Sequence, residues 1–339
     1  MTRRLLAGTA AFLAAFAATL PARAALDVVT TTPDLGSLVR SVGGDAVEVT
    51  VLVKGPQDAH FMEPRPSFIR KLHDAELFVL LGLDLEIGWA PVLIRSARNA
   101  AVQPGGAGYL DASAAIAPLE VPATTVDRSM GDLHAYGNPH YLTDPVNGVR
   151  VARLIRDRLA SLAPTSRATF EANTKAFEET VARRLVGDAV ARSLGPERVI
   201  ALADAGRLLG ELTERGELAS LSGWLGRLRP HAGARAVQDH RLWPYFAHRF
   251  GLELIDTLEP MPGIPPTGRH LQQVVERARA ERAEGILSSP YFDPRHARWV
   301  SEKAGIPVVP MAHQPGAREG TDDYVATIDY NVGQWAGVF

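Results

Sequence analysis

The sequence predicts an α/β protein of two lobes, each built on a parallel β-sheet, joined by a long rigid helix. Two observations lead to this fold class. Strands and helices alternate in both halves of the chain, and a long helical stretch without a strand separates the halves. Strand–helix–strand units at this spacing are typical of parallel sheets. The chain has 339 residues, which is enough for about two domains of roughly 150 residues each.

The first half of the chain opens with a buried strand and then follows a regular alternation. The expected elements are a strand at 27–32, a helix at 33–44, a strand at 47–53, a helix at 66–75 and a strand at 76–82. The last of these strands is almost entirely apolar, as the central strands of parallel sheets are.

The second half repeats this plan without repeating the residues. We expect strands at 233–240, 252–258, 285–290 and 306–311, with helices at 241–251, 270–283 and 294–305 between them. Gly251 and Gly305 end two of these helices, as glycine commonly does. The repetition predicts a second α/β lobe.

The middle of the chain is helical. Asp144 is suited to cap a helix that has Pro145 at its first position. A second helix is expected from Thr165 until Gly187, because no proline or glycine interrupts this stretch. We therefore divide the chain into a signal peptide (1–24), an N-terminal lobe (25–164), a linking helix with a helical insertion (165–230) and a C-terminal lobe (231–339).

The first 24 residues have the pattern of a cleaved export signal. Arg3 and Arg4 precede an apolar stretch that is shorter than the roughly 20 residues of a membrane span. The small residues Ala22 and Ala24 then form an A-x-A-like cleavage site. We expect a soluble protein exported to the periplasm.

Composition excludes several classes of protein and site. The formal net charge of -2 gives no sign of nucleic-acid binding. The chain contains no cysteine, which excludes disulfides, thiolate metal ligands, cysteine nucleophiles and a lipid-bearing cysteine behind the signal.

Three of the ten histidines lie where a parallel-sheet protein would build a site. His60 and His140 are on tight loops of the first lobe, and His240 ends the first strand of the second lobe. Ligands bind outside the carboxyl ends of parallel strands. The pair Asp322-Asp323 could add a carboxylate, although either residue could instead cap the helix that follows. Three imidazoles and one carboxylate would complete a tetrahedral shell around a divalent metal.

These segments resemble the periplasmic zinc- and manganese-binding receptors of ABC transporters, a group with two lobes joined by a rigid helix. Four segments carry the resemblance, in the order of the chain. The segment from Asp58-Ala59-His60 through Pro66 matches D-P-H-x-x-E-P-x-P, and the segment from Pro139-His140 through Pro145 matches P-H-x-x-x-D-P. In the second half, His240 precedes Tyr245-Phe246 and Gly251-Leu252, and Asp322 stands two residues before Tyr324. The match covers nearly the whole chain after the signal.

The resemblance implies a binding protein that captures a divalent metal and delivers it to a permease in the inner membrane. Its implied ligands are His60, His140, His240 and Asp322, with Asp323 open as the alternative to Asp322. Zinc is the expected metal and manganese the alternative, since three nitrogen donors suit zinc and manganese prefers oxygen-rich sites. His240 also stands where manganese members often carry glutamate. We expect a monomer that binds no nucleic acid, and loading by a metallochaperone stays open.

The chain departs from this group in three places. Ala59 replaces the usual proline, and the stretch from about Leu185 to Trp224 is longer than a plain linking helix. The histidine-rich loop of many zinc members is reduced here to His134, which we retain as a candidate auxiliary ligand. Glu63 and Asp144 lie close to the expected ligands and could accept hydrogen bonds from their rings.

Two other functions were weighed against the receptor. A secreted zinc hydrolase would need an open coordination position, which four protein ligands would not leave. The sequence also lacks H-E-x-x-H and G-x-S-x-G. A cell-surface adhesin is the third candidate, because secreted members of this group were once so described, but nothing in the sequence marks such a protein. We therefore expect no enzyme activity.

Overall fold

The computed structural model describes residues 25–123, 134–261 and 263–339. The expected signal peptide, residues 1–24, lies outside the described residues. Among the helices that are described, none is long and apolar enough to cross a membrane.

The first lobe is built on a four-stranded parallel sheet with the strand order β2-β1-β3-β4. The strands are β1 (Leu26–Thr30), β2 (Val47–Val51), β3 (Leu77–Leu80) and β4 (Tyr109–Asp111), and the accompanying helices are α1 (Pro33–Gly43), α2 (Pro66–Asp74) and α3 (Ala90–Ala97). All four residues of β3 are buried, in keeping with its apolar sequence and its place inside the sheet.

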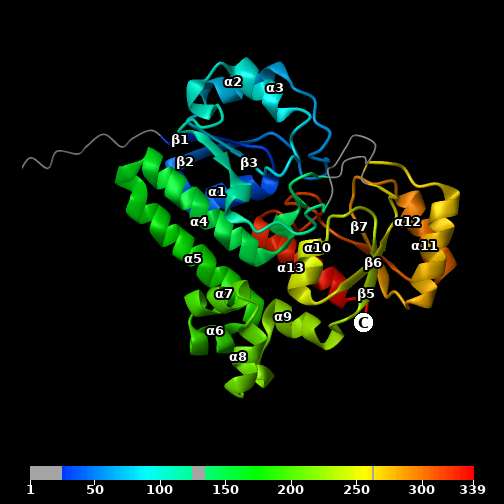
Figure 1. Ribbon diagram of the computed structural model, residues 1–339. Helices are drawn as coiled ribbons and strands as arrows, with labels where there is room; N and C mark the ends of the chain where they lie inside the picture. The colour runs from blue at the N-terminus through cyan, green and yellow to red at the C-terminus, as the bar shows by residue number, and fades with distance from the viewer. Residues whose placement is uncertain (1–24, 124–133, 262) are drawn as a thin grey trace, which may run out of the picture.

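The second lobe has the same architecture, with the strand order β6-β5-β7-β8 and all pairs parallel. Its strands are β5 (Arg235–Gln238), β6 (Glu253–Thr257), β7 (Gly285–Ser288) and β8 (Val308–Pro310), and its helices are α10 (Pro244–Phe250), α11 (Gly268–Ala280) and α12 (Pro294–Ala304). The two sheets with flanking helices confirm the predicted α/β fold of two lobes (Figure 1).

Within the described residues, the chain between β4 and β5 contains helices and loops but no strand. The connection consists of α4 (Pro145–Leu162), α5 (Arg167–Val186), α6 (Asp188–Leu194), α7 (Pro196–Asp204), α8 (Leu208–Glu214) and α9 (Gly223–Leu228). The helices α4 and α5 lie side by side, and the shorter helices gather at the far end of α5 (Figure 1). Gly187 ends α5 with a φ of 80°, a value that a residue with a Cβ rarely adopts.

The last helix, α13 (Tyr324–Ala336), returns from the second lobe to the first. The Tyr324 hydroxyl donates to the backbone oxygens of Leu142 at 2.8 Å and Asp144 at 3.1 Å. Its backbone N–H donates to the Ser37 hydroxyl on α1. The C-terminal segment 231–339 therefore forms the second lobe and also contributes a helix that packs on the first.

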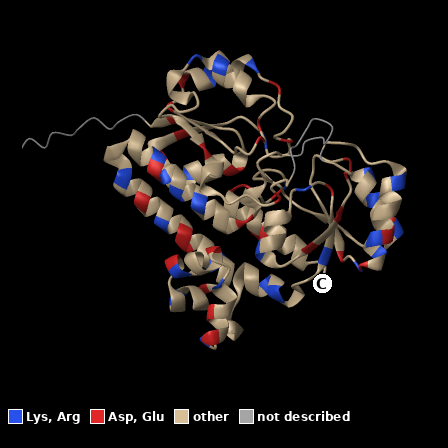
Figure 2. Ribbon diagram, viewed as in Figure 1, with Lys and Arg blue, Asp and Glu red and all other residues tan. Residues whose placement is uncertain are grey.

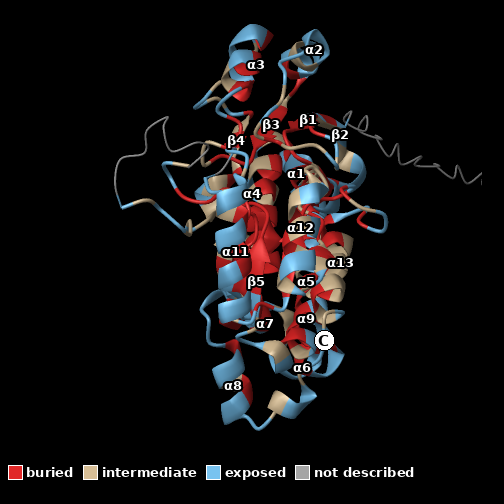
Figure 3. Cartoon of the chain, turned by 90° about the vertical axis from the view of Figure 1, so that its right-hand side faces the viewer, coloured by how far each residue is buried: buried red, intermediate tan, exposed pale blue. Residues whose placement is uncertain are grey.

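Both sheets and the helices beside them carry buried residues, which are red in Figure 3. Most of the core is one continuous cluster that runs from the first lobe through α4 and α5 into the second. A smaller cluster lies between the second sheet and α11 and α12. The continuity of the larger cluster joins the lobes through packing as well as through the chain.

Charged residues of both signs are spread over the outer helices (Figure 2). On α5, Arg167 faces Glu171 and Arg183 faces Glu179, each one helical turn apart. Neighbouring charges of opposite sign on a helix surface offset one another. This pattern agrees with the small net charge of the chain.

Candidate metal centre

Three histidines from the two lobes meet at one place. His60 follows β2, His140 lies just before α4, and His240 follows β5. The three offer ligand atoms that all lie within 4.8 Å of one another. Their ring centroids are 5.3, 5.5 and 5.6 Å apart, so the rings form a nearly equilateral triangle. The separate loops of the sequence thus bring three imidazoles together across the lobes.

Asp58 fixes the ring of His60. Its Oδ1 lies 2.6 Å from His60 Nδ1 and also accepts the backbone N–H of His60 at 2.9 Å. Burial opposes ionisation of Asp58, but the hydrogen bonds and nearby charge of His60 outweigh it and lower the pKa of this carboxyl. An ionised Asp58 requires a proton on Nδ1, which leaves the Nε2 lone pair free for a metal.

Glu259 holds His240 in the same way from the second lobe. Its Oε2 lies 2.6 Å from His240 Nδ1, and both side chains are buried. The ring of His240 also stacks against Phe292, with centroids 5.5 Å apart. The carboxylate and the phenyl ring together leave His240 one free ligand atom, Nε2.

His140 presents a buried ring nitrogen to the site. Its Nε2 is buried and has no hydrogen-bond partner among the described residues. Burial, followed by the charges of His60 and His240, holds the pKa of His140 well below its usual range. A buried nitrogen without a partner is costly unless something binds it. The Nε2 atom of His140 is therefore available to a metal ion, and in the rings of His60 and His240 a carboxylate holds only Nδ1.

His134 lies against this group. Its Nε2 is 3.2 Å from His60 Nε2, and the two rings stack with centroids 5.2 Å apart. Burial and the neighbouring imidazoles lower the pKa of His134 to about 3. The ring of His134 also lies edge-on to that of His140, with centroids 6.4 Å apart. The candidate auxiliary ligand thus lies beside two of the three rings, although it is outside the group whose ligand atoms are all within 4.8 Å.

The acidic pair near the C-terminus does not join the three histidines in this structure. Asp322 is exposed and is not part of the group. Asp323 caps α13, accepting the N–H of Ala326 at 2.8 Å. Asp144 caps α4 through the N–H of Val146 and pairs with Arg249, and Glu63 is exposed. Neither Asp144 nor Glu63 has a hydrogen bond to a ligand ring.

The carboxylates that do hold the rings were missed as individual residues in the sequence analysis. Asp58 was noted only as part of a matched segment, and Glu259 was not noted. The positions of both carboxylates in the sequence could have indicated their role. Asp58 stands two residues before His60, and Glu259 follows β6, the strand next to β5, at whose end His240 lies. Neighbouring parallel strands end at the same edge of a sheet, so their following residues meet there.

Comparisons with known proteins agree with this fold. The sequence profile of the family "zinc-uptake complex component A periplasmic" (ZnuA) matches residues 28–184 and 215–336. A manganese ABC transporter substrate-binding lipoprotein, PsaA of Streptococcus pneumoniae, is 22% identical over 91% of this chain and 86% of its own length. The zinc-binding lipoprotein AdcA of S. pneumoniae serotype 4 is 27% identical over 50% of this chain and 33% of its own.

A crystal structure of ZnuA superposes on 93% of this chain and 99% of its own with a TM-score of 0.65 at 24% sequence identity. At this identity the likeness supports the fold alone. The family profile leaves out residues 185–214, which lie within the stretch expected to hold an insertion. Since the profile matches most of the chain, the chain belongs to the family of zinc-uptake complex component A, a family of metal-binding transport receptors and not of enzymes.

Proposed function

We propose that this protein captures zinc in the periplasm and delivers it to an ABC permease in the inner membrane. The observation that carries the proposal is the convergence of three imidazoles whose ligand atoms lie within 4.8 Å of one another. Carboxylates fix two of the rings, and the third presents a buried nitrogen without a partner. The metal is the cargo of this site.

The donor set favours zinc over manganese. Zinc accepts three imidazoles readily, whereas manganese prefers sites richer in oxygen. The names of the relatives include both metals, so family membership alone does not choose between them. The presence of His240 at the third position, held by Glu259, supports zinc as the cargo.

Asp322 is proposed as the fourth ligand, because its segment matches the receptors that the sequence resembles. Here it is exposed, so metal binding would have to draw its loop inward. His134 is the competing fourth donor, since its Nε2 already lies 3.2 Å from His60 Nε2. The variants Asp322→Asn and His134→Gln separate the two: only loss of the true fourth ligand weakens zinc binding strongly.

The first experiment measures the metal content and affinity of the purified protein. We expect one tightly bound zinc per chain, and His140→Ala should weaken zinc binding by several orders of magnitude in a chelator competition. His231→Ala is the matched control, because the ring of His231 stacks on Phe339 and is not one of the three clustered histidines. Wild-type zinc affinity in His140→Ala would overturn the site assignment.

The second experiment tests the cargo in the cell. A strain that lacks the protein should grow poorly when zinc is chelated, and added zinc should restore its growth. Restoration by manganese but not by zinc would assign the manganese function instead. Location in the periplasm is tested by whether the mature protein, beginning after Ala24, is released with the periplasmic fraction.

A further inference from the structure

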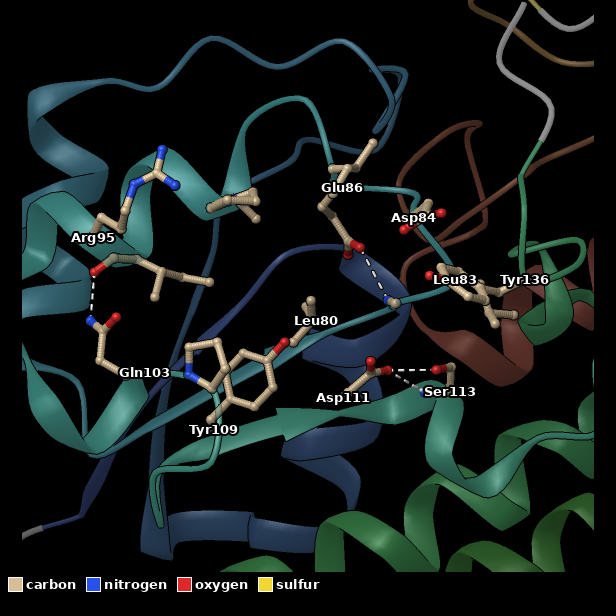
Figure 4. Close-up of a pocket in the computed structure, with 16 residues that line it drawn as sticks. Leu80, Leu83, Asp84, Glu86, Arg95, Gln103, Tyr109, Asp111, Ser113 and Tyr136 are labelled. Atoms are coloured by element: carbon tan, nitrogen blue, oxygen red, sulfur yellow. Dashed lines mark hydrogen bonds between the residues drawn. The ribbon is translucent and has the colours of Figure 1, made fainter. Parts of the chain in front are cut away.

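A second cavity lies in the first lobe, apart from the three histidines. It has a volume of about 530 Å³, within the range of sites that enclose small organic molecules. It opens between α3, the carboxyl ends of β3 and β4, and the loop that follows β3 (Figure 4). None of the three histidines lines it. The proposed function gives this cavity no role.

The walls of the cavity are mainly apolar. Leu80, Leu83, Ile87 and Ile94 line it together with Ala90. Ile87 is 66% exposed, which makes it one of the most exposed large apolar residues among those described. Apolar walls favour a ligand with an apolar body, since binding removes that surface from water.

Two carboxylates, those of Asp84 and Asp111, line the cavity on the side away from Arg95 (Figure 4). Asp111 accepts the N–H and the hydroxyl of Ser113 through Oδ1, and no ion pair to Asp84 or Asp111 is found within the described ranges. Burial and the charge of Asp111 both raise the pKa of Asp84. Arg95 lies at the opposite end of the cavity (Figure 4). The negative end thus lacks a cation.

The backbone holds these carboxylates in place. Gly82, Leu83 and Asp84 have successive positive φ values of 82°, 50° and 65°. A Cβ on Gly82 would lie 2.1 Å from Asp111 Oδ1, so only glycine lets the two segments approach this closely. Glu86 secures the loop by accepting the backbone N–H groups of Leu81 and Gly82.

We propose that this cavity binds a small organic amine, with the ammonium group between Asp84 and Asp111 and the apolar body against Leu83, Ile87 and Ile94. A protonated amine supplies the positive charge that the two carboxylates lack, and its hydrocarbon part matches the walls. A metal ion alone would leave the apolar walls in contact with water. The chemical class of the ligand is therefore an ammonium ion with an apolar chain or ring.

The loop that lines this cavity is bonded to the segments that carry two of the histidines. The Trp89 indole donates to the backbone oxygen of Ala59, next to His60, at 2.9 Å. The Tyr141 hydroxyl donates to the backbone oxygen of Leu81 at 2.7 Å, next to His140. An amine that orders the loop would thereby also order the metal ligands, and coupling of this kind is reciprocal.

The test uses 2-phenylethylamine as the probe and 2-phenylethanol as its uncharged counterpart, each titrated calorimetrically into the zinc-loaded protein. We expect saturable binding of one amine per chain. Asp84→Asn and Asp111→Asn should each weaken it about tenfold, the effect of losing roughly one charge-assisted contact. Asparagine tolerates a positive φ, so the loop should keep its shape in Asp84→Asn. The control Asp293→Asn changes a cap on α12 outside the cavity.

A second variant tests the apolar part of the cavity. Ala90→Leu fills space beside Ile94 and should abolish binding of the amine while leaving zinc affinity within threefold of wild type. Absence of saturable amine binding, or binding that both asparagine variants leave unchanged, would overturn the proposal. Amine binding that is lost in His140→Ala but kept in Asp84→Asn would instead place the amine on the zinc. Zinc affinity, measured separately, reports on the proposed transport function.

Discussion

Arg249 of the second lobe forms a bidentate ion pair with Asp144 of the first. Its Nε and Nη2 donate to the two carboxylate oxygens of Asp144, each at 2.8 Å. The side chains are 13% and 5% exposed, so water screens this pair little. Asp144 caps α4 four residues after His140, and Arg249 lies on α10 nine residues after His240. The pair therefore fixes the spacing between the two segments that carry these ligands.

Arg249→Ala should destabilise the protein by about 3 kcal/mol, because it leaves the Asp144 carboxylate buried without its partner. Arg249→Lys should lose less, since lysine keeps the charge but not the two-pronged geometry. The measurement is urea unfolding of the metal-free protein. Arg235→Ala, which breaks an exposed pair with Glu253, serves as the control and should remain close to wild type. Equal stability of Arg249→Ala and Arg235→Ala would show that the buried pair adds nothing.

Asp58→Asn and Glu259→Gln should each weaken zinc binding about 10- to 100-fold, because an amide orients the imidazole less firmly and does not raise its basicity. Chelator competition measures the change. Glu63→Gln is the matched control, since Glu63 lies three residues from His60 but is exposed. An effect of Glu63→Gln as large as that of Asp58→Asn would contradict the pairing seen between Asp58 and His60.

The fold was predictable from sequence because its signals are local. The apolar run of β3 and the glycine that ends α5 at Gly187 each act within a few residues. His60 and His240 could also be placed, since they follow β2 and β5 and ligands bind outside the carboxyl ends of parallel strands. These signals depend on periodicity and on position along a strand, which a single sequence displays.

Contacts between segments that are distant in the chain could not be predicted from such local patterns. Arg249 and Asp144 are 105 positions apart, and their pairing depends on how α10 sits against α4. The sequence allowed either aspartate of the C-terminal pair to cap α13, and the structure gives that role to Asp323. The packing of α13 on the first lobe was likewise not predicted. An amphipathic pattern indicates that one face of a helix is buried, but it does not indicate which surface that face packs against.

The stability of the metal-free protein should fall with decreasing pH, in part because of His313. Burial lowers the pKa of His313 to about 4, below the usual value of about 6.5. Between these two values the unfolded chain takes up a proton that the folded protein does not, so unfolding is favoured as pH falls. Above pH 6.5 both states are neutral at this residue and its contribution is constant.

His313→Gln tests this assignment. Glutamine retains an N–H for the Gln57 backbone oxygen but does not titrate. Urea unfolding at pH 7.0 and pH 5.0 should show a smaller loss of stability in the variant than in wild type. His296→Gln, at a half-buried position on α12, is the control and should keep the wild-type pH dependence. An identical loss of stability in wild type and His313→Gln would show that His313 does not contribute to the pH dependence.

Metal binding should move the lobes only slightly, because they are already tied together close to the site. The amide of Gln314 donates to the backbone oxygens of Gly55 and Gln57 across the lobes, each at 3.0 Å. Near His140, the Asn138 amide donates to the backbone oxygen of Arg241 at 2.7 Å. The helices α5 and α13 add packing between the lobes, so a wide hinge motion would have to break all of these contacts at once.

X-ray scattering of the metal-free and zinc-loaded protein measures this motion. The two profiles should nearly superimpose, with a radius of gyration that is unchanged within error. A double variant, Gln314→Ala with Arg249→Ala, removes two of the ties and should show a clear contraction on adding zinc, because its metal-free lobes can separate. This variant shows that the method would detect an opening. A contraction of several ångströms in the wild-type protein would mean that the contacts described here belong to a closed state and that the free receptor opens widely.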